Sequence, residues 1–305
     1  MRRTLTPDQF ALAWSRTDGD RIPYPLAVRL SAADNVERAA QLPALHRWRD
    51  EHLDADLEAA LRVLARPALR VELFGYGPAE PERPASAAGQ PEFRPAQLEP
   101  TARRTGLPGD AESRAGRGES GTHPADPGTN PPNSGLGAPI RVLGAVAGEI
   151  AVVVAQLPGS TPDRGGDLRI AVGSPGTFAA RMITPLPRNR AGTLPALTTP
   201  LARVTEDSRD LVTVPVSGPS VPARIRRLLR APRDGIGQIV VSVRRDAGAL
   251  APFGVLCWID VAGDGRYAVR TGAEVEVTPV TAESFAGRLR PMLTAAGRVT
   301  PRAVW

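Results

Sequence analysis

The most constraining feature of this chain is a series of alternating segments near its C-terminus. Apolar and polar residues alternate with a period of two over four short segments, at 237–246, 253–261, 266–271 and 273–278. Such alternation is typical of β-strands that bury one face. Glycines stand at the turns, and the Ala-Gly-Asp-Gly sequence at 262–265 can adopt the positive φ of a tight hairpin. These segments therefore predict an antiparallel meander.

The two faces of the second predicted strand bear on function. One face would carry Phe253, Val255, Cys257, Ile259 and Val261, and the other would carry Leu256, Trp258 and Asp260. We assign the first, larger apolar set to the core. Trp258 on the second face then has two interpretations, a further core residue or an anchor for a partner.

A helix is predicted after the meander. Thr281 can cap it, and Phe285, Leu289, Met292 and Leu293 follow at helical spacing. Burying these four side chains would contribute roughly 6–12 kcal/mol before entropy is subtracted, so the helix is expected to pack on the sheet. Pro291 is expected to kink or split it.

The composition changes abruptly over residues 77–138. This stretch of 62 residues holds 11 prolines and 10 glycines and few large apolar residues. It cannot bury enough apolar surface to offset the entropy of ordering, so we predict a disordered insertion.

The remaining segments suggest a repeated order of elements. A first helix is expected to start at Thr6-Pro7 and to end at Asp18-Gly19-Asp20. Further helices are expected at 34–50, interrupted by Pro43, and at 55–65, 176–184 and 221–230. An extended edge segment is expected at 23–30, and strands at 69–74, 140–146, 149–157, 167–173 and 211–216. Thr6 and Pro7 form a typical helix start. Helices 55–65 and 221–230 are each followed by about four strands and a helix, which suggests two quasi-symmetric αββββα halves.

The predicted fold class is α+β, with a central antiparallel sheet flanked by helices. The N-terminal half covers 1–185, an irregular connector covers 186–218 and the C-terminal half covers 219–305. The two meanders would protect their edges either by joining edge to edge or by packing face to face.

No catalytic or metal-binding constellation emerges from the sequence. His46 and His52 do not share one helical face, His123 lies in the insertion, and the single cysteine, Cys257, lies on a predicted strand. A zinc site needs three or four ligands, and no Ser–His–acid arrangement is apparent. We therefore expect no enzyme activity, no metal and no cofactor.

Charge and targeting signals leave two classes of function. The net charge is +6 and every basic residue is arginine, with the densest cluster at Arg224, Arg226, Arg227 and Arg230. This cluster is either a solvated helix face or a binding surface, and an arginine-rich nucleic-acid-binding protein is the alternative function. No transmembrane run and no secretory signal are apparent, and a lone cysteine fits a reducing compartment, so a cytoplasmic location is expected.

Several sequence segments together resemble the EspG family, the ESX (type VII) secretion-associated chaperones of actinobacteria. They are LTPDQFALAW at 5–14, IPYPLAV at 22–28, DLEAALRVLARP at 56–67, IRRLLRAPRDGIGQIVV at 225–241 and WIDVAGDGRY at 258–267. The resemblance covers nearly the whole chain outside 77–138. That insertion falls where the family has a variable loop between its second and third strands.

The resemblance implies a cytosolic, non-enzymatic chaperone with two quasi-symmetric halves that share an antiparallel sheet. It implies binding of the apolar helical tip of a PPE protein paired with a PE protein, or of a related helical-hairpin substrate. This would keep the substrate soluble and direct it to its secretion system. We expect a monomer or a weak homodimer, with no membrane contact and no nucleic acid.

A partner-binding groove can be sketched from these expectations. A helical tip needs apolar lining and a charged rim. The face of strands 237–245 and 253–261 that we take as free offers the lining, and two helices offer the rim. The candidate residues are Val240, Leu256 and Trp258 for the lining, and Arg226, Arg230 and Arg288 for the rim.

Overall fold

The computed structural model describes residues 1–17, 21–79, 136–205, 219–245 and 248–299. Most of the predicted insertion at 77–138 and the predicted strand at 211–216 lie outside these residues. Within the described part of the chain, no helix is both long enough and apolar enough to cross a membrane.

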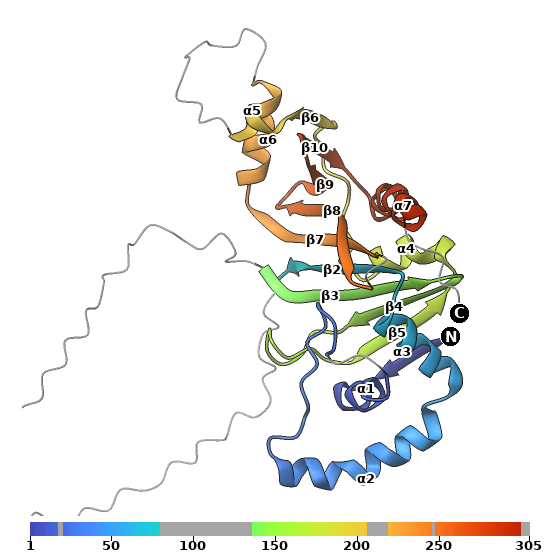
Figure 1. Cartoon of the computed structure of the whole chain (residues 1–305). Helices are drawn as coiled ribbons and strands as arrows, with labels where there is room; N and C mark the ends of the chain where they lie inside the picture. The colour runs from blue at the N-terminus through green and yellow to red at the C-terminus, as the bar shows by residue number, and fades with distance from the viewer. Residues whose placement is uncertain (18–20, 80–135, 206–218, 246–247, 300–305) are drawn as a thin grey trace, which may run out of the picture. The chain divides into compact units, whose positions relative to one another are not determined.

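Ten strands form one antiparallel sheet (Figure 1). They are β1 Arg2–Leu5, β2 Leu69–Pro78, β3 Leu136–Ala147, β4 Ile150–Gln156, β5 Leu168–Gly173, β6 Leu197–Pro200, β7 Arg233–Arg244, β8 Leu250–Val261, β9 Gly265–Thr271 and β10 Glu274–Pro279. Their order across the sheet is β1-β5-β4-β3-β2-β7-β8-β9-β10-β6. The predicted antiparallel sheet is confirmed.

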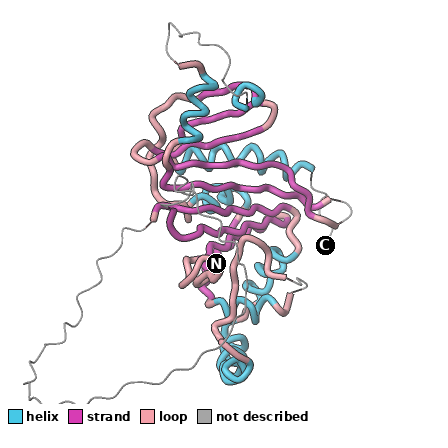
Figure 2. Tube along the Cα trace, turned by 90° about the vertical axis from the view of Figure 1, so that its left-hand side faces the viewer, coloured by secondary structure: helices cyan, strands magenta, loops and turns pink. Residues whose placement is uncertain are grey.

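The helices lie on both faces of this sheet. They are α1 Pro7–Trp14, α2 Asn35–His52, α3 Ala55–Ala65, α4 Phe178–Ile183, α5 Leu201–Thr205, α6 Val221–Arg230 and α7 Ala282–Val299, with a 3-10 turn at Pro175–Thr177. Helices α4 and α7 cover one face, called here the α4–α7 face, and α1, α3 and α6 pack on the other, the α3–α6 face. Figure 2 shows α7 behind the central strands, which stay bare on the near side.

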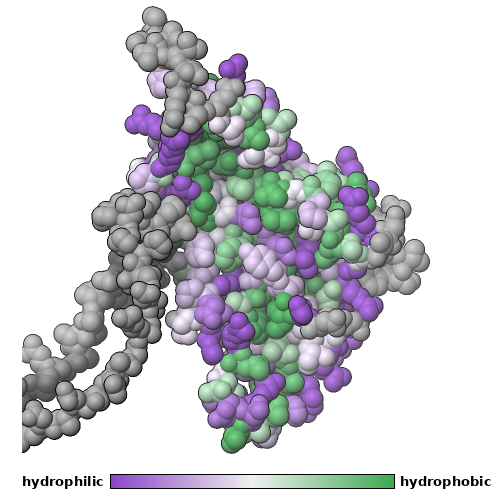
Figure 3. Space-filling view, turned by 60° about the vertical axis from the view of Figure 1, so that its left-hand side comes forward, coloured by the Kyte–Doolittle hydropathy of each residue, from purple (hydrophilic) through white to green (hydrophobic). Residues whose placement is uncertain are grey.

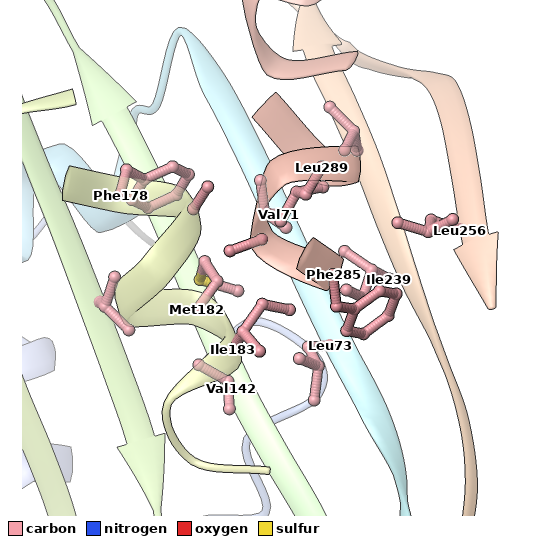
Figure 4. Close-up of a cluster of buried hydrophobic side chains, with 14 of the residues drawn as sticks. Val71, Leu73, Val142, Phe178, Met182, Ile183, Ile239, Leu256, Phe285 and Leu289 are labelled. Carbon is pink, nitrogen blue, oxygen red and sulfur yellow. The ribbon is translucent and has the colours of Figure 1, made fainter. Parts of the chain in front are cut away.

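The largest core lies on the α4–α7 face, in the middle of the sheet (Figure 4). Phe178 and Met182 from α4 and Phe285 and Leu289 from α7 point at strands from both halves. The predicted helical spacing after residue 281 therefore matches the buried side of α7. Pro291 lies inside α7, which continues to Val299, and Pro43 lies inside α2 in the same way, so neither proline splits its helix.

The two halves meet edge to edge through one strand pair. β2 and β7 are antiparallel neighbours from Leu69 opposite Val243 to Tyr76 opposite Ile236. The chain follows the order α3-β2-β3-β4-β5-α4 on one side of this pair and α6-β7-β8-β9-β10-α7 on the other. This order agrees with the predicted repeat, while the quasi-symmetry of the halves in space stays a prediction.

The two outermost strands differ from the sequence expectation. The prediction of an extended edge strand at 23–30 is wrong, because the edge is formed by β1, which pairs with β5. At the opposite edge, β6 pairs with β10, so the connector predicted to be irregular contributes a strand to the sheet. Thr6 caps α1 as predicted, in a capping box with Gln9.

The connector is fastened to the turn between β8 and β9. Asp264 accepts hydrogen bonds from the Thr193 backbone N–H at 2.8 Å and from the Tyr267 hydroxyl. The Arg190 guanidinium donates to the carbonyl oxygens of Asp264 and Gly263. The segment WIDVAGDGRY thus serves to hold the connector on the sheet.

Candidate functional site

The face of β8 that carries Leu256 and Trp258 is buried, contrary to the sequence assignment. Trp258 is 0% exposed and Leu256 is 4% exposed, and both lie in the core on the α4–α7 face. Phe253 and Val255, which we assigned to the core, are 36% and 43% exposed. The prediction that Leu256 and Trp258 stand on a free face is therefore wrong.

The remaining candidate residues do not form one site. Val240 lies on β7, opposite Glu72 of β2 and Val255 of β8, on the α3–α6 face. Arg226 and Arg230 lie on α6, which packs on that same face, whereas Arg288 lies on α7. Arg288 is thus the candidate rim residue on the helix that covers Trp258.

A groove lies beside α7, at the end of the sheet formed by β8, β9 and β10. Its volume is about 710 Å³. We call it the α7 groove. Its lining residues are Phe253, Gly254, Val255, Leu256, Ala268, Arg270, Thr271, Glu276, Thr278, Gly287, Arg288, Pro291, Met292 and Ala295. Two of the predicted site residues, Leu256 and Arg288, therefore line one cavity, while Val240 and Trp258 do not.

The groove arises from unequal strand lengths. β8 pairs with β7 from Leu250 to Val261, but it pairs with β9 only from Cys257 onward. Among the described strands, none pairs with the β9-facing side of β8 over residues 250–256. The β9-facing side of β8 is therefore open next to Phe253 and Val255. Helix α7 borders the groove on the α4–α7 face.

The floor of the groove depends on close packing between α7 and β8. A Cβ atom on Gly254 would lie 3.0 Å from the Met292 sulfur, so glycine lets α7 approach the strand there. Leu256 and Ala268 are both buried beneath this contact. The floor is consequently apolar and continuous with the main core.

The rim of the groove carries charge of both signs. Arg270 of β9 stands directly opposite Glu276 of β10. Arg288 projects from α7 and is exposed. Within the described residues, none of these three side chains makes a salt bridge at 4.0 Å or less. An apolar floor with an unpaired charged rim is the arrangement that suits a protruding apolar element of another protein.

Sequence reasoning missed most of this groove. Phe253 and Val255 were placed in the core because alternation shows two faces without showing which one is covered. Strand length was a usable signal. The six residues predicted for 266–271 are fewer than the nine predicted for 253–261, so part of the longer strand had to lack a partner on that side.

Two observations on the described residues concern metal binding and thiol chemistry. Among them, no three His, Cys, Asp or Glu side chains cluster closely enough to hold a metal ion. Burial raises the pKa of the Cys257 thiol, which favours its protonated form. The arrangement of the site suits binding.

Comparisons with known proteins agree with the fold. The sequence model of the EspG family matches residues 6–93 and 128–291. No curated protein matches the chain. One similar solved structure is the Mycobacterium tuberculosis type VII secretion system chaperone EspG5 in complex with the PE25–PPE41 dimer. It shares 15% identity at a TM-score of 0.56, over 100% of this chain and 99% of that chain.

Proposed function

Because the chain belongs to the EspG family, we propose that it is a cytosolic, non-enzymatic chaperone of type VII secretion that binds PE–PPE substrates. The substrate's apolar helical tip would occupy the α7 groove. There it would be kept from aggregating until the complex reaches its secretion system. The observation that carries this proposal is the α7 groove itself, with its apolar floor and unpaired charged rim.

The dimensions of the groove support this occupant. About 710 Å³ lies within the range of roughly 300–1,000 Å³ that binding pockets span, so it can accept a few apolar side chains from a helix end. The neighbouring Phe253 and Val255 extend the apolar surface at the open edge of β8. The similar EspG5 structure was solved with a PE–PPE dimer, which makes a substrate of that class the first to test.

The direct test is co-expression with a PE–PPE pair from the same genome, followed by size-exclusion chromatography and titration. Val255→Asp places a charge in the apolar lining, and Arg288→Glu reverses a rim charge. We expect each substitution to weaken binding by about 2 kcal/mol, or roughly 30-fold, with little change in stability.

Matched controls lie outside the groove. Ile150 is an apolar residue with 42% exposure, close to that of Val255, so Ile150→Asp should leave binding unchanged. Arg290→Glu makes the same charge reversal on α7 beside the groove and should also be neutral. Equal binding by Val255→Asp and the wild type would remove the groove from the proposal. A wild-type protein that binds no PE–PPE pair would refute the proposed function.

A further inference from the structure

The charged residues of the α7 groove come from both of its sides. Arg288 belongs to α7, whereas Arg270 and Glu276 belong to β9 and β10. Ala268 lies in the core on the α4–α7 face, and Arg270 follows two residues later on the same strand, so its side chain points to that face as well. Glu276 stands directly opposite Arg270 and shares this face. All three charges therefore border the side of the sheet that α7 covers.

The positive charge of the rim is greatest on its α7 side. Residues directly opposite on antiparallel strands have Cβ atoms about 4.5–5.5 Å apart, so the Glu276 carboxylate partly offsets the charge of Arg270. Arg288 has no acidic neighbour of this kind on its own helix, because the positions three and four residues away hold Ser284, Phe285, Pro291 and Met292. Two arginines and one glutamate leave the groove with a net positive rim.

We propose that the α7 groove selects cargo whose apolar helical tip carries an acidic residue, which Arg288 and Arg270 contact from the two sides. The proposal rests on the proposed function, because it specifies the chemistry of the same occupant. A guanidinium group binds a carboxylate through two parallel hydrogen bonds. Leu256 and Ala268 form a buried apolar floor beside these charges, and a docked tip would exclude water there, which strengthens the attraction. Glu276 would repel the same carboxylate and so limit the affinity.

The bare part of the α3–α6 face is less suited to selection by charge. Figure 3 shows hydrophobic and hydrophilic residues interspersed over the side of the molecule on which the central strands are bare. On β2, Arg70 and Glu72 alternate with core residues of the opposite face, so they point to this bare side, and they form a salt bridge at 2.9 Å. A partner that docked there would meet charges that are already paired with each other. A dependence of binding on Arg270, Glu276 and Arg288 therefore reports on the groove.

The test measures binding of a PE–PPE pair from the same genome to the full chain by isothermal titration calorimetry. Arg270→Gln and Arg288→Gln should each weaken binding about tenfold, because each removes one attraction to the acidic residue. Glu276→Gln should instead strengthen binding about threefold, because it removes a repulsion. In about 0.5 M salt, where the Debye length is only a few ångströms, all three effects should shrink.

Matched controls make the same charge changes outside the groove. Arg290→Gln lies on α7 and Glu274→Gln lies on β10, and neither residue lines the groove. Both residues are exposed, so binding by each control should stay within about twofold of the wild type. Circular dichroism verifies that every variant is folded.

A charge exchange identifies the residue of the cargo. Each acidic residue of its helical tip is replaced by arginine in turn, and one replacement should lose binding to the wild type but regain it with Arg288→Glu. If no replacement is rescued, or if the groove variants bind like the controls, the charge selection is wrong and the proposed function still stands. Opposite signs, with Glu276→Gln weaker and the arginine variants tighter, would identify a basic tip and also overturn it. A wild-type chain that binds no PE–PPE pair would refute both.

Discussion

Trp258 is held in the core by its neighbours on both sides. Its ring packs edge-on against Phe285 of α7, with ring centroids 6.3 Å apart. On β7 and on β2 beyond it, Cβ atoms on Gly237 and Gly75 would lie 2.1 Å and 2.7 Å from the ring, so glycine is required at both positions. The ring thus ties α7 to the centre of the sheet.

Truncating this side chain should be costly. Trp258→Ala removes a fully buried ring, and we expect a loss of about 3–5 kcal/mol in the free energy of unfolding, measured by urea denaturation. Val255→Ala, at an exposed position on the same strand, should cost less than about 1 kcal/mol. A Trp258→Ala protein with wild-type stability and lost substrate binding would restore the original sequence interpretation.

The interpretation of β8 failed for a physical reason. Both of its faces are apolar because both are packed, with Trp258 beneath α7 and Ile259 beneath α6. Alternation predicts which residues share a face, and it did so correctly here. Which face is exposed at Val255 depends on where β9 ends, a tertiary property that local periodicity does not contain.

The β8–β9 hairpin and the connector form a single fastened unit. Gly192 lies against the Tyr267 ring, where a Cβ would come within 1.9 Å of it. Inside the sheet, Arg266 donates two hydrogen bonds of 2.7 Å to Asp260 and one to the Pro187 carbonyl. The Gly192–Tyr267 contact and the Arg266–Pro187 hydrogen bond each join residues more than seventy positions apart.

Stability of this unit should depend on pH through Asp264. Burial acts to raise the pKa of this carboxyl, but hydrogen bonds from Tyr267 and Thr193 outweigh it, so the pKa lies below the ordinary value. Because the folded-state pKa is depressed, its stabilisation is present above about pH 4 and is lost as pH falls through the folded value. Asp264→Ala should cost about 1–2 kcal/mol at pH 7.

Thermal melts of both proteins across pH check this prediction. The difference between Asp264→Ala and the wild type should shrink below about pH 4, where the wild type also loses the carboxylate. Asp234 is an exposed carboxylate that makes none of the hydrogen bonds to the connector, so Asp234→Ala is the control. Its stability should differ little from that of the wild type at every pH. A constant difference for Asp264→Ala would exclude the carboxylate charge as the cause.

Elements with strong periodicity were predictable, and short ones were not. The meander β7–β10 and helices α3, α6 and α7 agree with the sequence expectation because each has a long apolar pattern. β1 and β6 have four residues each, too few to establish a period. Pro43 and Pro291 were given too much weight, because each removes one backbone hydrogen bond from a helix of 18 residues.

At the scale of the molecule, β2 and β3 pair up to the two ends of the segment that connects them. Pro78 stands opposite Leu136 at the end of that strand pair. A chain in which residues 80–135 are replaced by two or three glycines should therefore form the same hairpin. Closure entropy changes by only about 0.6 kcal/mol per doubling of loop length, so stability should change by a few kcal/mol at most.

Calorimetry of the deletion variant decides this point. A single cooperative transition within a few degrees of the wild type is expected. Loss of cooperativity would show that the fold of the described residues depends on the deleted ones. A deletion of equal length cannot be made elsewhere without removing strands, so Gly272→Ala in the β9–β10 turn serves as a mild folding control, since a Cβ there meets open space.

The way the halves join was left open by the sequence. Edge-to-edge and face-to-face arrangements bury the same alternating residues, so periodicity does not distinguish them. The structure resolves this with Val71 and Val241 paired beneath α4 and α7, which cross from one half to the other. The candidate groove depended on the same tertiary arrangement, which explains why the sequence prediction placed both Arg288 and Trp258 in it, whereas only Arg288 lines it.

The lengths of the two outer strands have a consequence for aggregation. Every other described strand has a partner on each side over at least part of its length, so apart from the open beginning of β8 the outermost backbone belongs to β1 and β6. β1 presents Arg2 and Arg3, and β6 ends at Pro200. Short edges that carry charge or proline are poor templates for the addition of foreign strands. These two outer edges therefore leave little backbone on which another chain could extend the sheet into a fibre.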